Sequence, residues 1–319
     1  MTGDLALFAI GASRPYGARV ARHLDLVLGE LEERAFEDGE HKIRPLVEVG
    51  RQDVFVIHSL YGDADQSPND KLCRLLFFIG ALKDAGAGRV TAVAPYLCYA
   101  RKDRRTQPRD PVTTKYVAAM FEACGADGVM TFDVHNVAAF ENAFRRPTTN
   151  LEAIPLFVEH FAALLRDEPT AVVSPDIGGA KRAEQFRRAL ALELHQEPTA
   201  AFVEKRRSGG VVSGDLLVGE VHDRAVIILD DLISTGGTLL RAALRCHDAG
   251  ARRIFAAATH GLFMGGAPSV LGDPVFEEIV LADTVRSVAA AEGRLPEKIR
   301  HLDSTRLLAD TIIAAHAGV

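Results

Sequence analysis

Two adjacent carboxylates followed by a turn of small residues form the segment of this sequence with the clearest chemical meaning. Asp230 and Asp231 follow the apolar run Val226–Leu229, which is typical of a buried parallel strand. After them, a turn of small residues opens onto a helical pattern: Ser234, Thr235, Gly236, Gly237 and Thr238. Backbone N–H groups in such a turn, and at the start of a helix, form a cradle for phosphate.

The two acids need a different partner from the turn, because carboxylates repel phosphate. Sugar hydroxyls or a magnesium ion would suit Asp230 and Asp231, so a phosphorylated ribose satisfies both halves of the segment. The alternative is a plain strand-to-helix turn capped by Ser234, which leaves the paired acids without a role.

The bulk properties describe a chain with room for two domains. It has 319 residues, 48% of them hydrophobic, and a net charge of −6. That charge argues against a nucleic-acid or membrane-surface partner. The cysteines are few, lack metal-ligand spacing and suit a reducing compartment. The sequence has neither a basic signal-peptide start nor an apolar run long enough to span a membrane, so we expect a cytoplasmic protein.

Short apolar runs alternate with helical patterns along the chain, which predicts parallel sheets with helices on both faces. The segment Asp84–Ala94 is similar to Asp248–Ala258, as expected for two tandem copies of one architecture. Strands are expected at these ranges: Leu5–Ile10, Val54–Ile57, Val90–Ala94, Val129–Phe132, Ala171–Val173, Ala200–Val203, Val226–Leu229, Ile254–Ala258 and Ile279–Leu281.

Two segments of the first half have the composition of ligand-binding loops. The dense basic run Arg101–Arg109 could be a solvated face, a nucleic-acid patch or a polyphosphate site. The net acidity disfavours a nucleic-acid patch, and guanidinium groups match phosphate oxygens bidentately. The segment Phe36–Glu40 predicts a hairpin turn around Asp38 and Gly39, whose tip could also present Phe36 to a ligand.

Three further candidates have a structural alternative. His135 follows a strand, where a lone histidine is more often a structural residue than a ligand. Asp176 lies at a strand end before a helix, where a carboxylate can hold magnesium. The run Lys205–Arg207 precedes glycines and would ordinarily be a mobile surface loop, although mobile cations also suit phosphoryl-type transfer.

Taken together and in this order, these segments resemble the ribose-phosphate pyrophosphokinases, the synthetases of phosphoribosyl pyrophosphate. The segment around Asp230 resembles the loop that this family shares with type I phosphoribosyltransferases. The resemblance extends over nearly the full length and is carried by these further motifs: Phe36–Glu40, Tyr99–Pro108, Asp133–His135, Ser174–Gly179 and Lys205–Arg207.

The resemblance implies an α/β fold of two tandem type I phosphoribosyltransferase-like domains, each a mainly parallel sheet flanked by helices. Residues 1–147 would form the first domain, and 148–303 the second, which carries the ribose-5-phosphate loop. The C-terminal helix, 304–319, would pack back on the first domain. It also implies a homo-oligomer of dimer units that associate into a hexamer.

The implied enzyme is a ribose-phosphate diphosphokinase. It transfers the diphosphoryl group of ATP to the C1 hydroxyl of D-ribose 5-phosphate, giving 5-phospho-α-D-ribose 1-diphosphate and AMP. Transition-state cations would be Lys205 and Arg207, and magnesium would be the cofactor, held by His135 and Asp176. ATP would contact Phe36, Asp38, Glu40, Arg101, Lys102, Asp103 and Arg104, and ribose 5-phosphate would contact Asp230, Asp231, Ser234, Thr235, Gly236, Gly237 and Thr238.

Some positions depart from the family pattern. Ser234 stands where many members have Asp, and Lys102 where the motif usually has Gln, which leaves subclass, allosteric control and nucleotide choice open. A phosphoribosyltransferase would have no use for Phe36–Glu40 and Arg101–Pro108. A non-catalytic regulatory homologue would lack catalytic residues that are all present here.

Overall fold

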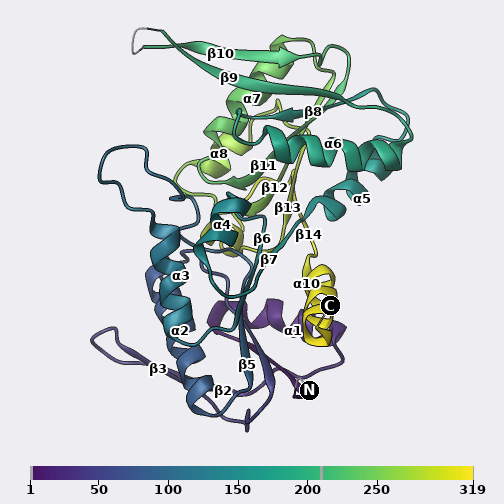
Figure 1. Ribbon diagram of the computed structural model, residues 1–319. Coiled ribbons are helices and arrows are strands. Elements are labelled where there is room, and N and C mark those ends of the chain that lie inside the picture. Colours follow the sequence, from purple (N-terminus) through teal and green to yellow (C-terminus); the bar gives the residue numbers. More distant parts are fainter. Residues whose placement is uncertain (1–2, 209–210, 319) are drawn as a thin grey trace. The chain divides into compact units, whose positions relative to one another are not determined.

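The chain forms two compact units. One consists of Met1–Leu151 together with Ser304–Val319, and the other of Glu152–Asp303. The computed structural model describes residues 3–208 and 211–318, and their side chains outside 205–215. Each unit is a sheet of mainly parallel strands covered by helices (Figure 1), so the predicted α/β fold class is confirmed.

The first unit is built on a five-stranded parallel sheet with the order β1-β4-β5-β6-β7. Its strands are β1 (Leu5–Ala9), β4 (Asp53–Ile57), β5 (Arg89–Ala94), β6 (Gly128–Phe132) and β7 (Thr148–Leu151). A 3-10 turn, Gly11–Ser13, precedes the first of its helices, which are α1 (Arg14–His23), α2 (Pro68–Asp84), α3 (Thr113–Ala123), α4 (Val137–Ala143) and α10 (Thr305–Ala317). A separate antiparallel hairpin consists of β2 (Leu31–Ala35) and β3 (His41–Pro45).

Strand alternation divides the residues of this sheet between two cores. Leu7 and Ala9 face α1 and α10, whereas Phe8 and Ile10 face α2, α3 and α4. Ser67 caps the start of helix α2: its hydroxyl accepts a hydrogen bond from the Asp70 N–H at 3.3 Å. Helices therefore cover both faces of the sheet: α1 and α10 lie on one face, and α2, α3 and α4 on the other (Figure 1).

Helix α10 is fixed to the first unit by a buried carboxylate. The Arg89 guanidinium donates to both oxygens of Asp53, through Nε at 2.6 Å and Nη2 at 2.5 Å, and to the Ala315 carbonyl at 2.8 Å. His316 Nδ1 lies 2.7 Å from Asp53 Oδ2, and Tyr16 Oη lies 2.8 Å from Ser304 Oγ. One strand-end carboxylate thus ties β4, β5 and α10 together.

The second unit is built on a seven-stranded sheet with the order β10-β9-β8-β11-β12-β13-β14, parallel except for the β9–β10 pair. Its strands are β8 (Thr170–Ser174), β9 (Thr199–Ser208), β10 (Val211–Gly219), β11 (Ala225–Ile233), β12 (Arg253–Gly261), β13 (Glu278–Ala282) and β14 (Ile299–Leu302). Its helices are α5 (Ile154–Leu164), α6 (Ala180–Leu194), α7 (Gly237–Asp248), α8 (Ala267–Leu271) and α9 (Val288–Ala291).

The same alternation orients this sheet. Ile227 and Leu229 pack with α5 and α6, and Val226 and Ile228 pack with α7 and α8. Every strand expected from the sequence is present, and β7 belongs to the first sheet through its pairing with β6. The first unit therefore extends through Leu151, past the residue 147 at which we placed the end of the first domain.

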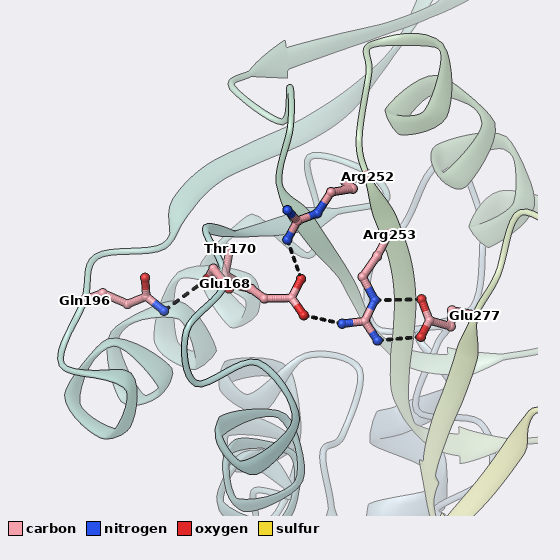
Figure 2. Close-up of polar contacts among 6 residues, drawn as sticks. All are labelled: Glu168, Thr170, Gln196, Arg252, Arg253 and Glu277. Carbon is pink, nitrogen blue, oxygen red and sulfur yellow. Dashed lines mark hydrogen bonds and ion pairs between the residues drawn. The ribbon is translucent and has the colours of Figure 1, made fainter.

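A network of ion pairs joins the amino-terminal ends of strands in the second sheet (Figure 2). Glu168 accepts from Arg252 Nη2 at 2.7 Å and also from Arg253 Nη1. Arg253 in turn binds Glu277 through Nε at 2.8 Å and Nη2 at 2.5 Å. These contacts hold the starts of β8, β12 and β13 together, at the end of the sheet opposite the candidate site.

The Asp53 contacts predict the consequence of removing one charge. Asp53→Asn should lower the free energy of unfolding by about 2–4 kcal/mol, because the Arg89 cation loses its carboxylate in a buried setting. Urea denaturation measures the loss, and hydrogen exchange over residues 305–317 should show that α10 is released.

The matched control is Asp310→Asn on the exposed side of α10, where the carboxylate pairs with Arg306 at 3.0 Å. That change should cost under about 0.5 kcal/mol. Equal effects of the two substitutions would contradict a special role for Asp53.

Candidate active site

The acid pair lies where β11 has a neighbour on one side only. Strand β11 pairs with β12 as far as Ile233, but its pairing with β8 ends at Ile228. Asp230 and Asp231 therefore lie within the strand. The sequence had predicted a shorter strand that ended before them.

Arg182, in the first turn of α6, brings a cation to this pair. Its Nη1 lies 3.5 Å from Asp231 Oδ1, and both side chains are largely buried. The Asp230 carboxylate turns back to accept a hydrogen bond from the Asp231 N–H at 2.8 Å. The two carboxylates thus share one edge of the second sheet with a guanidinium group.

Burial strongly raises the pKa of Asp230, and the neighbouring Asp231 carboxylate raises it further. Arg182 acts in the opposite direction and lowers the pKa of Asp230. Adjacent buried acids of this kind favour a ligand that supplies several hydrogen-bond donors or a cation.

The turn after β11 has the backbone geometry of an anion cradle. Gly236 has φ +77°, in the left-handed region, and forms the N-cap of α7. A larger residue would be strained by this conformation, and its β-carbon would lie 3.0 Å from Leu271 Cδ2, which would have to shift. The first turn of α7 consequently presents backbone N–H groups without a capping side chain.

A further cation lies beside this cradle. Arg241 Nη2 is 3.2 Å from Thr238 Oγ1, and Nη1 would be 3.5 Å from a β-carbon on Gly237. Cations are unfavourable near the positive end of a helix, so a guanidinium group at this place favours a bound anion. The cradle and Arg241 together are suited to a phosphate.

Asp176 lies at the carboxyl end of the strand beside β11, in the loop that leads to α6. Its side chain is exposed, and Oδ1 accepts a hydrogen bond from the Gly179 N–H at 3.1 Å. Ser174 Oγ donates to the Asp176 carbonyl at 2.6 Å and fixes the turn. The structure thus brings Asp176, Asp230 and Asp231 to one edge of one sheet.

The segment Phe36–Glu40, which is predicted to contact ATP, forms the exposed end of the β2–β3 hairpin, as the turn signal indicated. The Phe36 N–H donates to the Glu40 carbonyl at 2.8 Å, and Gly39 has φ +91°. Asp38 Oδ1 accepts from the Glu40 N–H at 3.0 Å. The Phe36 ring is 37% exposed, with the Arg34 guanidinium 5.0 Å from its centroid, so an aromatic ring is available to solvent.

Polar and aromatic contacts hold this hairpin against the first unit. Glu33 Oε1 accepts from the Gly11 N–H at 2.9 Å, and Glu33 Oε2 lies 4.0 Å from Arg74 Nη1. The His41 ring stacks on Phe77 of α2 at 5.3 Å. The hairpin therefore projects from a defined base.

The basic segment 101–104 is a surface loop of the first unit. Arg101 and Arg104 are exposed and make no hydrogen bond or ion pair within the part of the chain that the structure describes. Lys102 pairs with Asp110, and Asp103 Oδ2 accepts from Asn136 Nδ2 at 2.6 Å. The last contact joins this loop to the segment that carries His135.

His135 is exposed at the carboxyl end of β6, directly before α4. Asp133 has φ +33°, and its N–H donates to the Leu151 carbonyl at 2.8 Å, so the chain turns sharply there. His135 belongs to the first unit and Asp176 to the second. Within the described residues, no group of three or more His, Cys, Asp or Glu side chains is arranged to hold a metal ion.

The predicted transition-state cations fall in β9 and not in the surface loop that we expected. Lys205 pairs with Asp215 and Arg207 with Val212 across the antiparallel β9–β10 ladder. Their side chains lie outside the described residues.

Arg182, Arg241 and Asp110 were not found from the sequence. Arg182 had one usable signal, because a cation in the first turn of a helix is unfavourable unless an acid or an anion lies nearby. Asp110 follows the basic run and precedes Pro111, so it reads as an ordinary turn residue.

Comparison with known proteins gives close and long matches. The chain is 37% identical to the ribose-phosphate pyrophosphokinase of Haemophilus ducreyi over 97% of this chain and 95% of that protein. It is 36% identical to the enzyme of the same name from Vibrio parahaemolyticus, over the same shares. The solved phosphoribosylpyrophosphate synthetase of Mycobacterium smegmatis matches with a TM-score of 0.89 and 32% identity, covering 99% of this chain and 100% of that one.

Family models agree with these relatives. Residues 5–125 match the N-terminal domain of ribose phosphate pyrophosphokinase, and residues 212–318 match the phosphoribosyl synthetase-associated domain. None of the helices described here is long and apolar enough to cross a membrane. The chain is therefore a member of the ribose-phosphate pyrophosphokinase family and an enzyme of that family.

Proposed function

We propose that this enzyme transfers the diphosphoryl group of ATP to the C1 hydroxyl of D-ribose 5-phosphate. The observation that carries the proposal is the acid pair Asp230–Asp231 beside a phosphate cradle at one sheet edge. The products are 5-phospho-α-D-ribose 1-diphosphate and AMP.

In this proposal the second unit binds the sugar phosphate. Asp230 and Asp231 accept hydrogen bonds from the ribose hydroxyls, and the N–H groups and hydroxyls of 234–238 hold the 5-phosphate. Arg182 orients the acid pair through Asp231, and its charge opposes the rise in the pKa of Asp230 that burial causes. Fixing the ribose in this way supplies the orientation that an in-line reaction requires.

The nucleotide is proposed to bind through elements of the first unit. Phe36 stacks on adenine, and Asp38 and Glu40 accept from its amino group. Asp103 fixes the position of the 101–104 loop, and the exposed cations Arg101 and Arg104 of this loop face the polyphosphate. The C1 hydroxyl oxygen bonds to the β-phosphorus and loses its proton to water, while the bond from the β-phosphorus to the α,β-bridging oxygen breaks. AMP leaves with the bridging oxygen. Lys205 and Arg207 balance the charge that develops.

Magnesium is the proposed cofactor, with His135 and Asp176 as its protein ligands. The exposed Asp176 carboxylate fits a hard cation, and one protein carboxylate with substrate phosphates and water is a usual magnesium environment. When bound, the ion neutralises polyphosphate charge.

We also propose that the protein is a cytoplasmic homo-oligomer of dimer units. Analytical ultracentrifugation measures the assembly, and a sample that is active and strictly monomeric would overturn this proposal.

The reaction is tested by identifying the nucleotide product. With ATP, magnesium and ribose 5-phosphate, AMP should form in equal amount to the sugar diphosphate, and no AMP should form without the sugar. Chromatography of the nucleotides measures this. Formation of ADP would indicate simple phosphoryl transfer and would overturn the proposal.

Arg182→Gln should weaken ribose 5-phosphate more than ATP. Loss of one charge-assisted contact should raise the Michaelis constant for the sugar by about tenfold, roughly 1.4 kcal/mol. The sign of the pH effect follows from Arg182, which lowers the pKa of Asp230. Without it the pKa of Asp230 rises further, so sugar affinity should already be lost at a higher pH as the solution is acidified.

Arg182→Lys is the conservative control and should recover much of the affinity. If Arg182→Gln leaves both the sugar affinity and its pH profile unchanged, Arg182 has no role at the acid pair.

A further inference from the structure

Asp110 gathers the basic loop of the first unit around one carboxylate oxygen. Its Oδ2 accepts hydrogen bonds from Lys102 Nζ and Thr106 Oγ1, both at 2.7 Å, and from the N–H groups of Thr106 and Gln107, both at 3.0 Å. Arg105 Nε donates to the Asp110 carbonyl at 3.2 Å. These contacts close the segment into a compact loop even though it lies on the surface.

The base of the same loop is also fixed. Thr114, buried in the first turn of α3, donates through Oγ1 to the carbonyls of Tyr99 at 3.1 Å and Lys102 at 3.2 Å. Asn136 holds Asp103 at 2.6 Å. The loop is thus shaped by its own contacts before any ligand arrives.

This arrangement separates the cations of the loop into two kinds. The charge of Lys102 is paired with Asp110, whereas Arg101 and Arg104 are unpaired among the described residues. The Lys102 ammonium and the Thr106 donors hold the pKa of Asp110 well below its usual range, so the carboxylate stays charged at neutral pH.

We propose that Asp110 is a positioning residue for the nucleotide: it shapes the loop so that Arg101 and Arg104 meet the polyphosphate, and Lys102 serves the loop and not the ligand. The inference rests on the proposed function, in which this loop binds ATP. Pre-ordered cations lose less freedom on binding, which is how a residue outside the contact surface increases affinity.

Asp110→Asn distinguishes this role from its opposite. A positioning role predicts that the Michaelis constant for ATP rises about 3- to 10-fold, the net effect of about one lost hydrogen bond, and that the constant for ribose 5-phosphate is unchanged. If Asp110 merely masks Lys102, the substitution frees a cation and ATP binds more tightly. An unchanged or lowered constant for ATP overturns the proposal.

Hydrogen exchange reports on the loop independently of activity. In the full-length protein without nucleotide, the backbone amides of 102–109 should exchange several times faster in Asp110→Asn, because ordered backbone is protected from exchange. Lys102→Met should act in the same direction on exchange and on the Michaelis constant for ATP, and the double variant should be no worse than the poorer single variant. Additive effects would contradict a shared role. The matched control, Asp310→Asn, should change none of these readings.

Arg101→Ala and Arg104→Ala distinguish the positioning role of Asp110 from the proposed binding of ATP by this loop. If both leave the constant for ATP unchanged, the loop does not bind the nucleotide and the proposal falls with that assignment, even when Asp110→Asn loosens the loop. If both arginine substitutions raise the Michaelis constant for ATP and Asp110→Asn does not, the loop binds the nucleotide but Asp110 has no positioning role.

Discussion

The unequal pairing of β11 is the constraint on which the candidate site depends. The strand continues to Ile233 beside β12 but loses β8 after Ile228. The extension carries two acids along an edge that β8 does not cover, where Arg182 can reach them from α6.

The acid pair and the turn that resembles a phosphate cradle lie at different places along the chain. Carboxylates and a phosphate cannot share one surface, so the acids lie within the strand and the phosphate cradle lies past its end, where a left-handed Gly236 starts α7. Arg241 adds a cation on the cradle side. In the first unit Asp110 pairs with Lys102, whereas Arg101 and Arg104 have no ion pair among the described residues. Each unit therefore neutralises only part of the charge at its candidate site.

Local sequence patterns predicted the helices and strands but could not predict contacts between residues that are distant in the sequence. The apolar run at Val226–Leu229 and the small-residue turn after it identified β11 and the start of α7, because strand composition and glycine-rich turns are local properties. The sequence did not show that β11 continues through the acids, since that depends on pairing with β12. Arg182 and Asp231 are far apart in the chain, and only the packing of α6 beside β11 brings them together.

At Lys205–Arg207 the local composition predicted the wrong secondary structure. The charges of this run and the glycines that follow predicted a loop, but pairing with β10 places its backbone in a strand. Tertiary pairing overrides local composition there.

The central claim is that the sugar and the nucleotide are bound by different sets of residues, and paired binding measurements test it most directly. Calorimetry should show that Asp231→Ala weakens ribose 5-phosphate and leaves a non-hydrolysable ATP analogue unaffected. Phe36→Ala should weaken the analogue by about 1–3 kcal/mol, the value of a stacked base, and spare the sugar phosphate. The reverse pattern, or equal losses for both ligands in both variants, would contradict the account.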